Sequence, residues 1–259
     1  VFFLASGRAP KRLRARLWVL FALGGLQGAI GWWMVSSGLT ERLDVSQYRL
    51  ATHLTMAFLI LGLTLWTALE LRYGETRVFQ RSRYFPWAAA FWGAVMLQIT
   101  LGAFVAGLDA GVIHTTWPGF NGRLIPEGYL SGMPFWQAIF ESRPAVQLQH
   151  RWFAYALVIA AGALAWAYQS SGDRVMRNFA IALPAVIAVQ VVLGVATLMA
   201  AAPLWLSLLH QGGAIALFAT AGAAAWTAAR ATSPQESSAI MARPITSRAT
   251  SFTRSSPRS

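Results

Sequence analysis

Six long apolar stretches, separated by shorter segments that carry most of the charge, set the pattern of this chain. They cover residues 17–39, 48–71, 85–108, 144–169, 176–200 and 204–229. A helix needs about 20 consecutive apolar residues to cross a bilayer, and each stretch reaches that length. A helix satisfies its backbone N–H and C=O groups within its own segment, and the alternating pattern of a barrel strand is missing. The pattern therefore predicts an all-α, polytopic transmembrane helix bundle with six full spans.

The composition supports a membrane protein. Hydrophobic residues make up 56% of the chain and charged residues 12%, about half the charged share of a soluble globular protein. The formal charge of +12 would also suit a nucleic-acid-binding protein, but the arginines fall in the loops and the C-terminal tail. We therefore expect membrane lipid, and no nucleic acid, around the protein. The absence of cysteine excludes disulfides, thiolate-ligated metals and a cysteine nucleophile.

The charges between the spans predict the orientation. Residues 8–16 carry five basic groups and no acid, and residues 72–83 carry four arginines against one glutamate. These segments and the arginine-rich tail belong in the cytoplasm by the positive-inside rule. The loops around 41–44, 109–143 and 201–203 then face the other side. The tail, residues 231–259, is rich in Ser, Thr, Arg and Pro and is expected to be disordered.

One motif recurs three times along the chain: Gln-x-x-x-Gly in one span and a histidine near the start of the next. The instances are Gln27/Gly31 with His53, Gln98/Gly102 with His150, and Gln190/Gly194 with His210. A spacing of four places Gln and Gly on one helix face, where Gly allows a close approach and Gln offers a hydrogen bond. Repetition of this kind indicates three structurally equivalent helix pairs.

The three histidines also share a depth in the membrane. Each follows the start of its span by five or six residues, which places it roughly 8 to 9 Å below the outer end. Ionisable groups inside a membrane are costly and usually functional, and neutral imidazole binds iron well. Two imidazoles from facing helices would ligate a haem iron.

Two other interpretations of the histidines stay open at this point. A single buried histidine is often no more than a hydrogen-bonding group between helices. Zinc would require three or four ligands around one ion, usually with carboxylates or cysteines, and the membrane layer offers none. Haem is the metal cofactor that the repeat favours.

Polar groups near the histidines suggest further contacts. Arg151 follows His150 and Arg49 lies one turn before His53; both could pair with haem propionates, although snorkelling to the interface explains them equally well. His114 lies in the long 109–143 loop, where packing is the simpler interpretation and a substrate contact the alternative. The loop itself is aromatic-rich, which suits either a binding element or interfacial packing.

The ends of the chain bear on the number of helices. Residues 1–4 are apolar and precede a basic stretch, the reverse of a signal peptide. We interpret them as the end of a transmembrane helix whose beginning precedes the sequence. Three repeated histidines form one pair and leave one over, so we expect eight helices in the complete protein, with a fourth histidine on the preceding helix.

With these residues in hand, the sequence resembles the haem A synthase family in its alphaproteobacterial and mitochondrial form. The resemblance spans about residues 17–230. It rests on Gly24-Gly-Leu-Gln-Gly28, Gly31-Trp-Trp-Met-Val-Ser-Ser-Gly-Leu39, Val45-Ser-Gln-Tyr-Arg-Leu-Ala-Thr-His-Leu54, Gly102-Ala-Phe-Val-Ala-Gly-Leu-Asp-Ala-Gly111, Trp117-Pro118, Ile125-Pro126, Gln149-His-Arg151 and Leu209-His-Gln-Gly212.

The resemblance implies two pseudo-symmetric four-helix halves, each with a haem near the extracytoplasmic side of a bacterial inner membrane. Residues 5–75 would complete the N-terminal half, which receives haem O, and residues 76–230 would form the C-terminal half, which holds haem b. His150 and His210 would be the haem b iron ligands, with Arg151, Gln98 and Gln190 beside that cofactor.

In the other half, His53 would be the catalytic, iron-binding residue on the substrate side, with Arg49 and Gln27 as further substrate contacts. The family oxidises the C8 methyl of haem O to the formyl group of haem A for cytochrome c oxidase. Its first helices would precede the sequence, so we expect the chain to be inactive alone. Expected partners are haem O synthase and cytochrome c oxidase assembly factors, with a homo-oligomer left open.

Two alternatives to the enzyme remain at the level of sequence. A di-haem b-type membrane cytochrome would pass electrons and convert no haem O. A non-haem membrane transporter or assembly factor would use its histidines for protons or hydrogen bonds and would lack a Soret band.

Overall fold

The computed structural model describes residues 2, 6–7, 10–36, 45–74, 77–130 and 132–232. Six long helices dominate this part of the chain, and all six are long and apolar enough to cross a membrane, which confirms the predicted all-α class and the six spans. The elements are η1 (Lys11–Leu13), α2 (Arg14–Ser36), α3 (Gln47–Tyr73), β1 (Arg77–Phe79), α4 (Phe85–Gly107), η2 (Ala110–Val112), α5 (Phe135–Glu141), α6 (Arg143–Gln169), α7 (Arg174–Met199), α8 (Leu204–Ala228) and β2 (Arg230–Thr232).

Local sequence signals explain where several helices begin. Pro86 and Pro144 lie in the first turns of α4 and α6, where a missing N–H costs no helical hydrogen bond. Asp173 caps α7, because its Oδ1 accepts hydrogen bonds from the backbone N–H groups of Val175 (2.8 Å) and Met176 (3.4 Å). These residues thus explain where α4, α6 and α7 begin.

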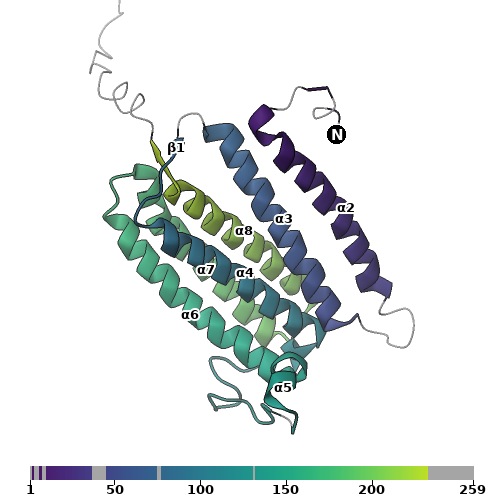
Figure 1. The fold of residues 1–259 in the computed structure, drawn as a ribbon. Helices are drawn as coiled ribbons and strands as arrows, with labels where there is room; N and C mark the ends of the chain where they lie inside the picture. Colours follow the sequence, from purple (N-terminus) through teal and green to yellow (C-terminus); the bar gives the residue numbers. More distant parts are fainter. Residues whose placement is uncertain are drawn as a thin grey trace, which may run out of the picture.

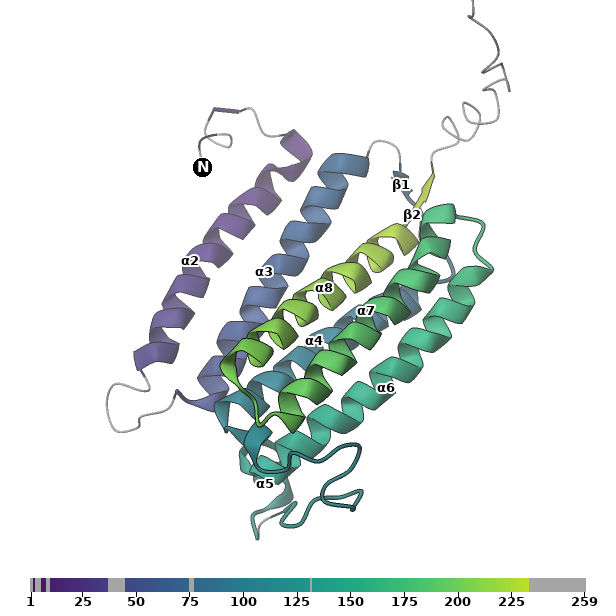
Figure 2. The same cartoon turned by 180° about the vertical axis from the view of Figure 1, so that it is seen from behind.

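Four of the helices form a closed bundle (Figures 1 and 2). Going round it, α4 packs against α6, α6 against α7, α7 against α8, and α8 against α4. Helices α6 and α8 therefore occupy diagonal positions. Helix α3 packs on the outside against α4 and α8, and α2 packs against α3 at the edge of the molecule.

Aromatic side chains pack between α3 and the bundle, where two glycines leave room for a ring. The Trp92 ring stands 5.3 Å from Phe218, measured between centroids. A Cβ atom at Gly62 or at Gly222 would lie 2.9 Å from Trp92, so the ring fits between α3 and α8 because both positions lack a side chain. This cluster continues into the main core, which includes Leu157, Leu183 and Leu217.

The two ends of the molecule differ in charge. At one end the strands β1 and β2 pair in antiparallel register, Arg77 with Thr232 and Phe79 with Arg230. We call this the basic end, because it gathers the following basic residues: Lys11, Arg12, Arg14, Arg16, Arg72, Arg81, Arg83, Arg174, Arg177 and Arg230. The 108–134 loop and α5 lie at the opposite end (Figure 1), which we call the loop end.

The strands β1 and β2 lie at the two ends of the segment 76–230, which was predicted to form the C-terminal half. The sequence pattern predicted no strand there. Ala231 and Thr232, the first two residues of the segment expected to be disordered, lie in β2, where β1 supplies their backbone hydrogen-bond partners. Residues 233–259, the 41–44 loop, and residues 1–4 apart from Phe2 lie outside the described residues.

Candidate functional site

The three Gln–His motifs occupy equivalent places in three helix pairs, α2–α3, α4–α6 and α7–α8. Each glutamine lies nine residues before the last residue of its helix, at Gln27, Gln98 and Gln190. Each histidine lies six or seven residues after the first residue of the next long helix. At about 1.5 Å per residue, all three histidines therefore lie about 9 to 10 Å along their helices from the loop end.

The contact within each pair is the same. The glutamine Nε2 donates to the backbone carbonyl of the histidine, at 3.2 Å for Gln27 and His53 and at 3.0 Å in the other two pairs. The glycine of the motif faces the ring: a Cβ there would lie 3.1 Å from Cε1 of His53, 3.0 Å from that of His150 and 2.8 Å from that of His210. In each motif the glutamine hydrogen bond and the close approach at the glycine thus both involve the histidine.

The glutamine does not occupy the ring nitrogens. Gln27 Nε2 lies 3.1 and 3.3 Å from the two ring nitrogens of His53, and Gln98 Nε2 lies 3.0 and 3.3 Å from those of His150. The lone pairs of an imidazole lie in the ring plane and diverge, so a donor almost equidistant from both nitrogens sits over the ring face. The in-plane lone pairs, which a metal would use, are therefore not directed at the glutamine.

His150 and His210 are the pair best placed to share one ligand. They come from α6 and α8, which occupy diagonal positions in the same four-helix bundle. Nδ1 of His210 is buried and has no hydrogen-bond partner among the described residues. One imidazole from each of two diagonal helices, with a buried ring nitrogen of His210 unpaired, would suit the binding of a haem iron in the bundle interior.

A zinc-type site is not found. Among the described residues, no group of three or more His, Cys, Asp or Glu side chains could hold a metal ion. Two imidazoles without carboxylates suit haem iron, which takes its other four ligands from the porphyrin, better than they suit zinc.

Arg151, predicted to contact haem, anchors the long loop in this structure. Its Nη1 donates to the carbonyl oxygens of Thr116 (2.8 Å) and Gly119 (3.1 Å), and its Nη2 donates to that of His114. The guanidinium also stands 4.3 Å from the ring centroid of the buried Phe120. A contact between Arg151 and a haem propionate stays a prediction.

Two further side chains of α6 hold the same loop and were missed at the level of sequence. Gln147 Nε2 donates to the carbonyl of His114 (3.1 Å), and the Tyr155 hydroxyl donates to that of Pro118 (2.8 Å). With Arg151 they form a stripe at spacing four, which places them on one helix face. That spacing is the signal in the sequence that indicates this stripe, and the Gln–Gly–His motifs do not include it.

His114 serves the loop chiefly through its backbone. Its ring lies edge-on to Phe120 at 5.6 Å between centroids, and its Nδ1 is buried with no hydrogen-bond partner among the described residues. Burial, and secondly the positive charge of Arg151, lower the pKa of His114 from its ordinary value of 6.5. These contacts favour the packing interpretation.

Arg49 ties α3 to the end of α2. Its Nη1 donates to the Trp33 carbonyl (2.7 Å) and to the Ser36 hydroxyl (3.2 Å), and its guanidinium lies 4.7 Å from the Trp33 ring centroid. A cation at a helix C-terminus is favourable because it faces unpaired carbonyl groups. The predicted substrate contacts of Arg49 and Gln27 stay predictions.

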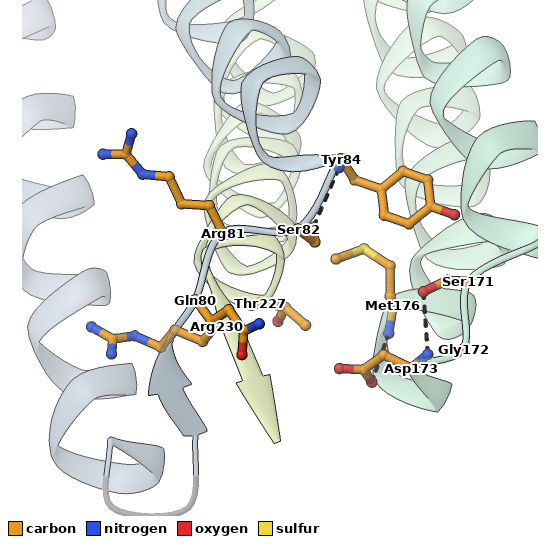
Figure 3. Close-up of a pocket in the computed structure, with 10 residues that line it drawn as sticks. All are labelled: Gln80, Arg81, Ser82, Tyr84, Ser171, Gly172, Asp173, Met176, Thr227 and Arg230. Atoms are coloured by element: carbon orange, nitrogen blue, oxygen red, sulfur yellow. Dashed lines mark hydrogen bonds between the residues drawn. The ribbon is translucent and has the colours of Figure 1, made fainter. Parts of the chain in front are cut away.

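A cavity of about 420 Å³ opens at the basic end (Figure 3). It lies between the segment after β1, the start of β2 and the turn before α7, and its lining includes Tyr84, Asp173 and Thr227. The histidines lie near the other end of the spans, so this cavity is separate from the candidate site.

Comparison with known proteins gives the family. Residues 1–222 match the family model COX15-CtaA, cytochrome oxidase assembly protein. Proteins named heme A synthase are similar along most of the chain. That of Maricaulis maris is 56% identical over 231 residues, 89% of this chain and 67% of its own length. Those of Caulobacter sp. strain K31 and Bradyrhizobium diazoefficiens are 47% and 44% identical, over 89% and 85% of this chain and 67% and 62% of their own lengths.

The chain thus spans about two thirds of the length of these relatives. No solved structure matches it. The family model covers far more than half of the sequence, including all three histidine motifs. The chain therefore belongs to the COX15-CtaA family, which its resemblance to haem A synthases had suggested.

Proposed function

We propose that this chain is the part of a haem A synthase that holds haem b between His150 and His210 and that presents His53 to the substrate haem O. One observation carries the proposal: two imidazoles on diagonal helices of a closed bundle are held by identical Gln and Gly contacts. His53 has the same contacts on α3, outside that bundle. The third imidazole therefore belongs to a second site.

The reaction of a haem A synthase converts haem O to haem A by oxidising the C8 methyl to a formyl group. A haem b held in the bundle would supply one-electron exchange. The residues of this chain supply ligation and position: the imidazoles bind iron, the glutamines fix the histidine backbone, and the glycines set how far each ring approaches the next helix.

We place these sites toward the periplasmic side of the bacterial inner membrane. The basic end carries most of the described arginines and belongs in the cytoplasm by the positive-inside rule. The histidines lie near the opposite end. A lipophilic haem would then enter from the outer leaflet or from a partner protein in the same membrane.

The test is to express the complete reading frame that contains this sequence together with a haem O synthase. Chromatography of extracted haems should reveal haem A, and purified membranes should show a haem b Soret band. Replacing His150 or His210 with Ala should abolish the stable haem b signal, whereas His53→Ala should abolish haem A and leave haem b in place.

Two outcomes would overturn the proposal. A haem b signal retained in both His150→Ala and His210→Ala would show that these residues are not the ligands. Two tightly bound haems with no haem A formed would point to the electron-transferring cytochrome instead.

A further inference from the structure

Each of the three glutamines has a buried acceptor that the protein leaves unused. Oε1 of Gln27, of Gln98 and of Gln190 is buried with no hydrogen-bond partner among the described residues. An unpaired buried carbonyl costs about 1–3 kcal/mol. Because this cost recurs at three equivalent positions, we expect a hydrogen-bond donor to pair with these oxygens in the functional protein.

The orientation of the amides is fixed by the histidine backbone. A carbonyl oxygen can only accept, so the amide nitrogen must face the histidine carbonyl at 3.0–3.2 Å. An interchange of the amide nitrogen and oxygen would place two acceptors together. The unpaired atom in each amide is therefore the oxygen.

The α7–α8 pair also leaves a matching donor unpaired. Nδ1 of His210 is buried without a partner among the described residues, in the same pair in which Gln190 Oε1 lacks one. The Gln190 amide already lies beside this ring, with its Nε2 3.5 Å from His210 Nε2. One hydrogen bond between the two would satisfy both atoms.

A metal-bound histidine normally donates its second ring N–H to an acceptor, which fixes the tautomer and makes the ring a more basic ligand. We propose that Oε1 of Gln190 accepts the Nδ1–H of His210 when Nε2 of that ring binds iron. This inference rests on the proposed function. It makes Gln190 a positioning residue that selects the ligating nitrogen and lowers the reduction potential of the haem.

A glycine on α8 keeps Gln190 in place for this role. A Cβ at Gly213 would overlap Gln190 Oε1, whereas a Cβ at the adjacent Gly212 would have nothing within 4 Å. Gly213→Ala must therefore displace the amide oxygen, and Gly212→Ala need not. The two substitutions make the same chemical change one residue apart on one helix, so they form a matched pair.

The experiment uses the complete haem-loaded protein in detergent and measures the haem b reduction potential by spectroscopic titration. Gln190→Leu removes the acceptor and should weaken binding of the ferric form relative to the ferrous form by roughly tenfold or more. A tenfold change raises a one-electron potential by about 59 mV. Gly213→Ala should raise the potential in the same direction, and Gly212→Ala should leave it at the wild-type value.

The outcomes separate this inference from the proposed function. A purely structural Gln190 predicts lower thermal stability with an unchanged potential, which overturns the inference and leaves the haem site standing. If the Gln190→Leu variant loses its haem, the reduction potentials of the Gly213→Ala and Gly212→Ala variants are compared instead. Equal potentials in these two variants would refute the acceptor role of Gln190. Wild-type protein without a Soret band would instead refute the proposed function.

Discussion

Replacing Arg151 with lysine tests whether this residue holds the long loop. The guanidinium reaches three backbone carbonyls of the loop, those of His114, Thr116 and Gly119, and covers the Phe120 ring. Lysine keeps the charge but has a single compact ammonium, which cannot span these acceptors in the same geometry. The substitution therefore removes the multiple contacts while leaving the net charge unchanged.

The expected magnitude follows from those contacts. A hydrogen bond from a charged group contributes about 1.5–3 kcal/mol, and a cation–π contact about 0.5–1 kcal/mol at an exposed site and more when desolvated. If lysine retains one of the three hydrogen bonds, the loop loses about 3 kcal/mol or more. Since about 1.4 kcal/mol corresponds to a factor of ten, loop opening should become at least roughly 100-fold more frequent.

Hydrogen–deuterium exchange of the loop amides, followed by mass spectrometry in detergent, measures that opening. Arg123→Lys is the matched control, because Arg123 lies in the same loop and its side chain forms an exposed ion pair with Glu127 at 2.8 Å. Such pairs contribute about 0–1 kcal/mol. Equal exchange in the two variants would refute the anchoring role, and a lost Soret band with unchanged loop exchange would favour the propionate contact predicted from sequence.

Three further changes have definite expected outcomes. Acidification below about pH 6.5 should increase loop exchange, because the lowered pKa of His114 favours the neutral ring in the folded state and stability is lost as the pH falls toward that value. Gly62→Ala should lower thermal stability by about 1–3 kcal/mol, because the new methyl would lie 2.9 Å from Trp92. Glu70→Gln should cost about 3–5 kcal/mol in detergent unfolding assays, because it leaves Arg230, only 10% exposed, without its carboxylate.

Each of these has a control that isolates the cause. His114→Gln should flatten the pH dependence of loop exchange, and an unchanged pH profile would contradict the assignment. Gly162→Ala, where a Cβ meets nothing within 4 Å, should be neutral or stabilising. Replacing Glu70 and Arg230 together with apolar residues should recover most of the stability lost in Glu70→Gln; no recovery would mean that the ion pair is not the cause.

The spans could be predicted from the sequence because few backbone structures are stable in lipid. A run of apolar residues must form a helix there, so six stretches gave six helices, with ends shifted by a few residues. The Gln–Gly–His contacts were predictable for the same reason: spacing along a helix fixes which side chains share a face. Within each of the three motifs, the glutamine and the glycine consequently contact the histidine, as the spacing indicated.

The loop contacts were harder to predict because the loop sequence has no helical or strand periodicity. Arg151 was assigned to a propionate from its place beside His150, yet its partners are backbone carbonyls more than 30 positions away. Backbone acceptors have no residue identity and therefore leave no signal in the sequence. The β1–β2 pairing was hidden similarly, since two three-residue strands are too short to show alternation.

Each Gln–His contact is confined to two spans that follow one another in the chain, α2–α3, α4–α6 or α7–α8. The orientation of a ring is therefore settled as soon as its own hairpin has inserted, whereas the gap between His150 and His210 depends on how two hairpins associate. The relative position of these two imidazoles can therefore change with the packing of the hairpins while each Gln–His contact stays intact.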